Sequence, residues 1–328
     1  MHKIDKRPVP VDRFSLRSSV PGTWVADSTL PQAKQMPRGV LRYVVPANPD
    51  HLDAVIQAAV DSKPFFPKGT LVSKTTSSVT LASLTEEQRS LIQSMVASSV
   101  NGRAAPVRAA VFDDESLGSN PNQILPHLFD SESDGVRKVI NSADIQAGAL
   151  DNFDVVVFPG GSAGQQAKAL GEEGSRAVQE FVRAGGGYVG ICAGSFLATC
   201  RPDRLSLVNA KANGRPDGGW VKLELTDVGN RILGNFPDLV VAQYSGGPIF
   251  SPAGEHDLPE YVPLAFYRTE LAMSQTEERI LVDTPAIIAA RFGKGRVLLF
   301  SVHPEGISEL KSLVKRAILS VAYDEQAK

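Results

Sequence analysis

The sequence predicts an α/β fold built on a mostly parallel β-sheet with helices on both of its faces. From Pro106 onward, short apolar runs rich in valine and isoleucine alternate with helical stretches. Such near-continuous apolar strands are typical of parallel sheets that are buried on both sides. Glycines, acids and one cysteine stand where these strands end, which is the edge where open α/β sheets place their sites.

The predicted elements follow a regular order along the chain. Strands are expected at residues 107–114, 136–140, 154–161 and 187–192, with an amphipathic helix over residues 172–187. The second half is richer in strands, which are expected at residues 220–226, 238–248, 264–271, 286–292 and 297–302. A Gly-Lys-Gly turn at residues 293–295 predicts a tight hairpin, and a helix over residues 308–323 closes the chain.

Residues 1–104 are richer in Pro, Ser and Thr and are predicted to form an N-terminal extension or a small accessory domain, with residues 105–328 as the main domain. One helix is expected at residues 49–62. A second begins at Thr85, where Thr85 and Gln88 fit a capping box. The segment Asn-Gly-Arg-Ala-Ala-Pro at residues 101–106 marks the boundary.

Composition excludes several classes of partner. The 328 residues carry a formal net charge of −2 without a Lys/Arg block, so neither a nucleic acid nor a membrane surface is an expected partner. The apolar runs are too short to span a bilayer, and the first ten residues contain no signal-peptide core. Two cysteines fit a reducing compartment, which favours the cytoplasm, while an exported protein trimmed of its leader stays open. The five histidines lack metal-site spacing, so no metal and no cofactor are expected.

Cys192 is the candidate nucleophile. It lies in the turn Gly-Ile-Cys-Ala-Gly, between a predicted strand and a predicted helix. Glycines on both sides permit a strained turn that lifts the thiol above the sheet, and the helix N-terminus favours a thiolate. Taken alone, the pattern is equally compatible with a structural cysteine. Cys200, which has no flanking glycines, is interpreted as structural.

His303 and Glu305 are the candidate base and its partner. His303 follows the apolar strand at residues 297–302, and Glu305 comes two residues later. A histidine at a strand end can take the proton of a thiol while a carboxylate orients its ring. A lone histidine there would be read as a solvated loop residue, but base and orienting carboxylate in one segment favour the catalytic interpretation.

Other residues at the same sheet edge are candidates for binding substrate. The amides of Gly160, Gly161 and Ala193 are predicted to stabilise an oxyanion, although glycines also suit a plain strand-to-helix turn. Asp114, at a strand end, is a candidate for holding a cationic group or only for solubility. The segment Tyr-Ser-Gly-Gly-Pro, which begins at Tyr244, ends a predicted strand and is expected to form a wall of the pocket, where the Tyr244 hydroxyl is a candidate for pointing inside.

Together these motifs resemble the class I glutamine amidotransferase-like superfamily. Gly-Ile-Cys-Ala-Gly, Phe-Pro-Gly-Gly and His-Pro-Glu all occur at the ends of β/α elements. Over about residues 106–310 the chain is similar to the biotin-protein ligase N-terminal-domain-like branch. The resemblance implies a flavodoxin-like three-layer sandwich and a triad of Cys192, His303 and Glu305. It also implies Gly160 and Gly161 in the oxyanion loop.

The chain departs from the glutamine-using pattern at Phe196, where such relatives carry glutamine. A fused synthetase domain and the glycine/arginine-rich ligase motif are not found in the sequence either. The sequence therefore favours a thiol-dependent amidase or hydrolase acting on a small amide or amidine substrate. A non-catalytic binding module and an amidotransferase subunit that delivers ammonia to a separate synthetase stay open, as does a homo-oligomer or a partner subunit.

Overall fold

The computed structural model describes residues 78–100, 106–114, 135–214, 218–236, 239–271 and 280–322, together with two strands nearer the N-terminus. These strands, β1 (Thr23–Asp27) and β2 (Val40–Val44), pair antiparallel with each other. The chain divides into two units, Met1–Lys68 and Gly69–Lys328. The helix predicted at residues 49–62 lies outside the described residues.

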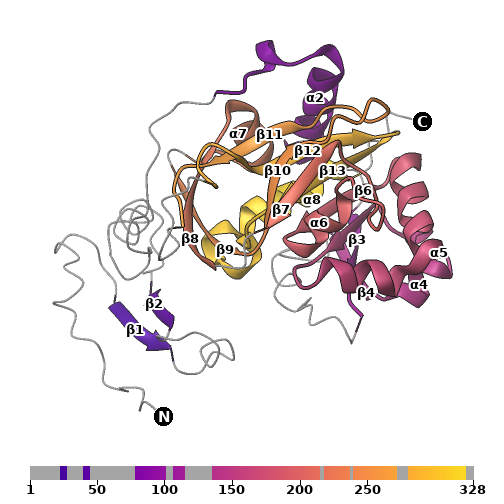
Figure 1. Ribbon diagram of the computed structural model, residues 1–328, viewed down its shortest axis with the longest axis horizontal. Helices are drawn as coiled ribbons and strands as arrows, with labels where there is room; N and C mark the ends of the chain where they lie inside the picture. Colours follow the sequence, from indigo (N-terminus) through magenta and orange to yellow (C-terminus); the bar gives the residue numbers. More distant parts are fainter. Residues whose placement is uncertain are drawn as a thin grey trace. The chain divides into compact units, whose positions relative to one another are not determined.

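The second unit is built around a mixed sheet that has nine strands among the described residues, in the order β4-β3-β5-β6-β13-β12-β11-β8-β9 (Figure 1). The strands β4, β3, β5, β6 and β13 run parallel, and the neighbours from β13 to β9 pair antiparallel. The bounds are β3 (Val107–Phe112), β4 (Gly135–Ile140), β5 (Val155–Phe158), β6 (Gly187–Ile191), β8 (Gly218–Leu225), β9 (Val240–Ser245), β11 (Val262–Tyr267), β12 (Pro285–Phe292) and β13 (Gly295–Phe300). A small separate sheet pairs β7 (Ala210–Gly214) with β10 (Pro248–Pro252).

Helices cover both faces of the large sheet. Helices α4 (Ser142–Gln146) and α5 (Ala163–Ala184) bury residues in the core of one face. Helices α2 (Glu86–Val100), α7 (Asp227–Leu233) and α8 (Lys311–Val321) bury residues in the core of the other. Helix α6 (Ala193–Ala198) follows β6 directly. The short 3-10 helices are η4 (Leu81–Ser83), η5 (Ala149–Asn152), η6 (Pro304–Gly306) and η7 (Ser308–Leu310).

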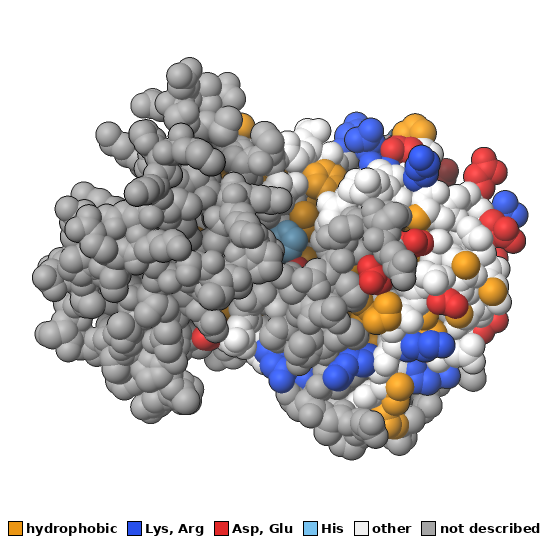
Figure 2. Space-filling view, turned by 90° about the horizontal axis from the view of Figure 1, so that it is seen from below, with side chains coloured by type: hydrophobic (Ala, Val, Ile, Leu, Met, Phe, Trp, Pro, Cys, Tyr) orange, Lys and Arg blue, Asp and Glu red, His pale blue; other side chains and the backbone are white. Residues whose placement is uncertain are grey.

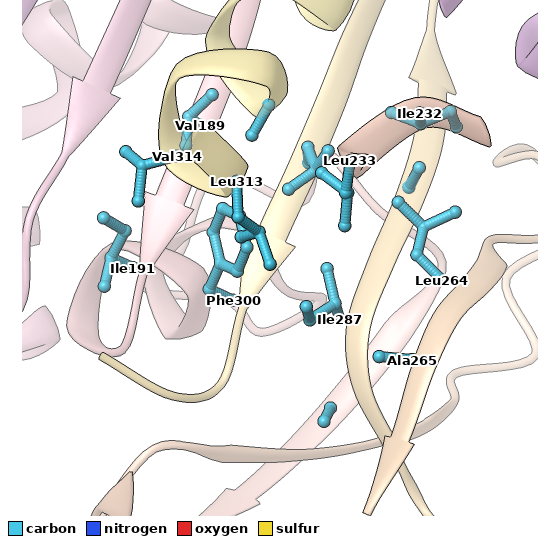
Figure 3. Close-up of a cluster of buried hydrophobic side chains, with 14 of the residues drawn as sticks. Val189, Ile191, Ile232, Leu233, Leu264, Ala265, Ile287, Phe300, Leu313 and Val314 are labelled. Atoms are coloured by element: carbon cyan, nitrogen blue, oxygen red, sulfur yellow. The ribbon is translucent and has the colours of Figure 1, made fainter. Parts of the chain in front are cut away.

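Each face of the sheet carries its own apolar core. Along β5, Val155 and Val157 belong to one cluster, while Val156 and Phe158 belong to the other. Figure 3 shows side chains of α7 and α8 lying against strands of the sheet in the first cluster. Because both faces are covered at this strand, β5 is apolar at every position rather than at alternate ones.

The prediction of an α/β fold is confirmed, and the structure refines several elements. The predicted parallel pairing holds for β3, β5, β6 and β13, which lead to Asp114, Gly160, Cys192 and His303, whereas β12, β11, β8 and β9 are antiparallel. The hairpin predicted at the Gly-Lys-Gly turn joins β12 to β13. Helix α5 begins nine residues before the predicted start at residue 172, because a helical segment that the sequence analysis did not predict precedes Gly171 (φ 62°) and is joined to the predicted helix there.

Helix α2 begins where the capping box predicted it. The Thr85 amide donates to Gln88 Oε1 at 3.0 Å, and the Gln88 amide donates to Thr85 Oγ1 at 3.2 Å. The helix lies within the second unit, Gly69–Lys328. The side chains of Leu91, Ile92 and Met95 are at most 2% exposed in the core beneath α2.

Candidate active site

Cys192 occupies a strained turn between β6 and α6. Its backbone has φ 50° and ψ −102°, a conformation that L-residues other than glycine rarely adopt. A Cβ atom on Gly194 would overlap the carbonyl oxygen of Phe158, and one on Gly190 would lie 2.7 Å from the backbone of Gly194. The two glycines are therefore required by close backbone approach. The turn holds Cys192 at the N-terminus of α6 with 7% of its surface exposed.

His303 is positioned by a backbone contact to the antiparallel half of the sheet. It follows β13, and its amide donates to the carbonyl of Gln243 in β9 at 2.8 Å. The His303 Nδ1 atom lies 2.7 Å from Glu305 Oε1. The Glu305 side chain is 4% exposed, so its carboxylate is shielded from water, whereas the His303 side chain is 21% exposed.

The electrostatics of the site favour a charged imidazole. Burial lowers the pKa of His303, but hydrogen bonds to Cys192 and Glu305, and the electrostatic attraction of both groups, raise that pKa to about 10. The raised pKa favours the imidazolium form of His303 at neutral pH. An adjacent imidazolium is the partner that stabilises a cysteine thiolate in general. When Cys192 is a thiol, it has a second contact, because its Sγ–H donates to the carbonyl of Ser245 at 3.7 Å.

The predicted oxyanion loop lies beside these side chains. A Cβ atom built on Gly160 would lie 2.7 Å from His303 Cε1 and 3.7 Å from the Cβ of Cys192. Gly161, the next residue, has φ 134°, which favours glycine. Within the described part of the chain, the amides of Gly160, Gly161 and Ala193 donate no hydrogen bond. Three amide donors close to the nucleophile are thus available to a ligand.

Asp114 and Tyr244 are held by internal hydrogen bonds. Asp114 Oδ2 accepts from the Ser142 hydroxyl at 2.5 Å, so its carboxylate supports the start of α4. Tyr244 is fully buried, and its hydroxyl donates to the carbonyl of Gly247 at 2.9 Å. Ser245 of the same predicted segment contacts the nucleophile, because its carbonyl accepts from the Cys192 Sγ at 3.7 Å.

Sequence reasoning missed two buried polar contacts that lie next to site residues. The Tyr267 hydroxyl donates to Ser301 Oγ at 2.6 Å, and its ring packs edge-on against Tyr244. Gln166 in the first turn of α5 is fully buried and donates to the carbonyl of Pro159. Helical spacing could have predicted that Gln166 is buried, because it lies on the same face of α5 as four buried residues, Leu170, Gly174, Val178 and Val182.

Two wider properties of the described residues bear on partners. They include no helix that is long and apolar enough to cross a membrane. They also bring together no group of three or more His, Cys, Asp or Glu side chains suited to a metal ion. On the described part of the face in Figure 2, Lys and Arg side chains occur together with Asp and Glu side chains.

Comparison with known proteins places these residues in context. The family described as biotin-protein ligase, N terminal, matches residues 141–203 and 220–326, more than half of the chain. A biotin–protein ligase of Schizosaccharomyces pombe is 23% identical over 177 residues, which cover 47% of this chain and 26% of the ligase. The chain thus matches about a quarter of the length of that relative.

The fold is similar to those of several solved structures. PurLQS from Thermotoga maritima has 17% identity and a TM-score of 0.47, and the match covers 66% of this chain and 98% of that one. A ThuA-like protein from Bacteroides uniformis has 14% identity and a TM-score of 0.48, covering 69% of this chain and 96% of that one.

Proposed function

The chain belongs to the biotin-protein ligase N-terminal family, and from this premise and the site geometry we propose that it is a thiol-dependent amidase or hydrolase. Its substrate would be a small amide or amidine. The observation that carries the proposal is the convergence of Cys192, in its strained turn, on the His303–Glu305 pair. A purely structural cysteine has no need of a positive-φ turn, a charged imidazole and a buried carboxylate.

In the proposed reaction, the Cys192 thiolate attacks the carbonyl or amidine carbon and forms a C–S bond. The tetrahedral intermediate collapses when the C–N bond breaks, and the His303 imidazolium donates its proton to the leaving nitrogen. Water then attacks the acyl-enzyme, with neutral His303 taking its proton, and releases the thiolate. Glu305 keeps the ring oriented through both halves of the reaction.

The amides of Gly160, Gly161 and Ala193 are proposed to stabilise the charge that develops on the substrate. Each is close in sequence or space to Cys192, and none of the three donates a hydrogen bond within the described structure. Loss of one such donor typically costs about 3 kcal/mol of transition-state stabilisation. Helices on both faces of the sheet are also consistent with the flavodoxin-like three-layer sandwich of the glutamine amidotransferase class, which we propose as the fold type.

Phe196 argues for a substrate other than glutamine. It lies one helical turn after Cys192, and a Cβ atom built on Gly214 would be 2.8 Å from its ring. The ring therefore packs against the end of β7 near the nucleophile, and at this position it offers no hydrogen bond to a glutamine substrate. Delivery of ammonia from glutamine to a synthetase is accordingly the less supported alternative.

Alkylation of the two cysteines tests the proposal. Iodoacetamide at neutral pH is expected to label Cys192 at least about tenfold faster than Cys200, measured by mass spectrometry of the tryptic peptides. Burial raises the pKa of Cys200, so this thiol serves as the slow internal control. His303→Asn should remove the difference.

Equally slow labelling of both cysteines would contradict the nucleophile and favour a non-catalytic binding module. Turnover is then measured with a panel of small amides and amidines, with Cys192→Ala as the inactive control. Ammonia release from glutamine that is lost in Cys192→Ala would revive the amidotransferase alternative.

A further inference from the structure

We propose that Gln166 is a positioning residue that orients the peptide group presenting the Gly160 amide to the substrate. This inference rests on the proposed function, because it concerns the donor that would stabilise the oxyanion. Gln166 belongs to α5, and its hydrogen bond is to neither the nucleophile nor the base. It acts through one backbone carbonyl, that of Pro159.

The Pro159 carbonyl joins three parts of the site. It ends the chain segment that leads from β5 to Gly160, and it accepts a hydrogen bond from Gln166 Nε2 at 2.9 Å. It also accepts from the amide of Gly194 at 3.2 Å. The side chain of α5 and the turn that carries Cys192 therefore hold the same oxygen. Both bonds are directed at the residue immediately before the proposed oxyanion donor.

Holding this oxygen also holds the next amide. The Pro159 carbonyl and the Gly160 N–H belong to one planar peptide group, and in a trans peptide they point in opposite directions. The described residues contain no cis peptide bond. With the carbonyl directed at Gln166 and Gly194, the Gly160 N–H is turned away from both. Glycines tolerate many backbone conformations, so this loop needs an external contact to select one of them.

The burial of Gln166 is difficult to explain without such a role. The side chain is completely buried, and in the described structure its Oε1 atom has no hydrogen-bond partner. An unpaired buried carbonyl is unfavourable, whereas the later positions of the same stripe, such as Leu170 and Val178, are apolar. An apolar side chain would fill the space at less cost. The amide is retained where its Nε2 donor reaches Pro159.

The test compares two reactions of the same thiol. Alkylation by iodoacetamide displaces iodide at a saturated carbon and develops no oxyanion. Acylation by p-nitrophenyl acetate does develop one: the thiolate adds to the ester carbonyl, the C–O bond breaks, p-nitrophenolate leaves and a thioester remains. Gln166→Met removes the donor while keeping the length and burial of the side chain. The matched control is Gln165→Met, because Gln165 is exposed and adjacent.

Gln166→Met is expected to slow acylation of Cys192 by about 10- to 100-fold and to leave alkylation within about twofold of the unsubstituted protein. Gln165→Met should change neither rate. An unchanged acylation rate in Gln166→Met would overturn the proposal. An equal loss in both reactions would also overturn it, since that is the result of a general structural role.

A second measurement separates this proposal from the proposed function. If the unsubstituted protein is acylated no faster than Cys192→Ala, the proposed amidase chemistry fails, whatever Gln166 does. The orientation of the peptide is then judged from the Gly160 amide resonance in protein labelled with ¹⁵N-glycine. A shift in Gln166→Met that is absent in Gln165→Met supports the positioning role. An unshifted resonance overturns it.

Discussion

At the scale of single residues, the site depends on groups that are far apart in sequence and tightly packed against one another in the structure. Gly160, Cys192 and His303 meet so closely that a Cβ atom on the glycine would lie 2.7 Å from the imidazole. Glu305 adds the buried negative charge that holds the ring. The absence of one side chain is thus as important here as the presence of the other three.

The ionisation of His303 gives the first prediction. Its ring is expected to titrate at about pH 10, and both Cys192→Ala and Glu305→Gln should lower this midpoint toward 6.5, because each removes a group that favours the imidazolium. Ring ¹³C–¹H NMR shifts followed against pH measure the midpoint. His303→Gln identifies the His303 signal by removing it, and His256→Gln, at an exposed histidine, should leave that signal unmoved.

The same shift fixes the sign of the pH dependence. Because the folded pKa lies above 6.5, the charged ring's contribution to stability is complete below pH 6.5 and is lost as the pH rises through about 10. Catalysis that uses the imidazolium as an acid should fall over the upper end of the same range. A His303 midpoint near 6.5 in the unsubstituted protein would contradict the charged pair.

Gly160→Ala is the second prediction. The added methyl group would displace the His303 ring from Cys192, so iodoacetamide labelling of Cys192 should fall by about tenfold or more with little change in stability. Gly164→Ala is the control, because a Cβ atom at this position would meet nothing within 4 Å. Gly164 lies in α5, where alanine in place of glycine is expected to raise the free energy of unfolding by roughly 0.5–1 kcal/mol. Comparable labelling rates in the two variants would show that the contact at Gly160 does not hold the ring.

At the scale of elements, the hairpin between β12 and β13 links the two halves of the sheet. The strand β13 pairs parallel with β6 on one side and antiparallel with β12 on the other. At the turn, Gly293 has φ 60°, and the amide of Lys294 donates to the carbonyl of Arg183 near the end of α5 at 3.0 Å. The hairpin therefore sets the position of β13, whose end carries His303.

The third prediction compares glycines with similar backbones. Gly293→Ala should lower the free energy of unfolding by about 2 kcal/mol or more, because a positive φ is unfavourable and the Cβ atom would lie 2.7 Å from the Arg183 carbonyl. Gly254 has φ 78°, but a Cβ atom there would meet nothing within 4 Å. Gly254→Ala is therefore expected to lower the free energy of unfolding by only about 1 kcal/mol. Urea denaturation followed by circular dichroism measures both. Equal losses would mean that the contact with α5 is unimportant.

At the scale of the whole molecule, α2 joins the N-terminal part of the second unit to its far end. Arg296 in β13 is 5% exposed and donates to Ser98 of α2 at 2.8 Å and to the carbonyl of Ser320 in α8 at 3.0 Å. One buried guanidinium thereby connects the sheet with two helices that lie more than 200 residues apart. The cooperative unit should accordingly include α2.

The fourth prediction tests this cooperative unit. Ile92→Ala is expected to lower the free energy of unfolding by about 2–5 kcal/mol, because the side chain is completely buried and its loss leaves a cavity. Gln93→Ala, at an exposed position of the same helix, should change it by less than about 0.5 kcal/mol. Tyrosine fluorescence during urea unfolding reports on the sheet. An unshifted transition in Ile92→Ala would support an independent N-terminal domain that includes α2.

Local features of this protein were predictable because their causes are local. The apolar runs of β5 and β6, the capping box at Thr85 and the hairpin at Gly293 each depend on residues within a few positions of one another. The glycines around Cys192 likewise indicated a strained turn, and the backbone of Cys192 adopts one. Periodicity and turn chemistry are properties of short segments, so they can be read directly along the chain.

Other features depend on contacts between distant segments. The sequence did not indicate that α2 packs in the core, that β8 and β9 are antiparallel, or that the Tyr244 hydroxyl is used internally. Nor did it show that Pro159 is held by Gln166. Each of these depends on which surfaces meet when the chain folds, and burial and hydrogen bonding between remote residues leave no short-range pattern. The candidate catalytic residues were therefore visible in the sequence, whereas the support that orients them became visible only in three dimensions.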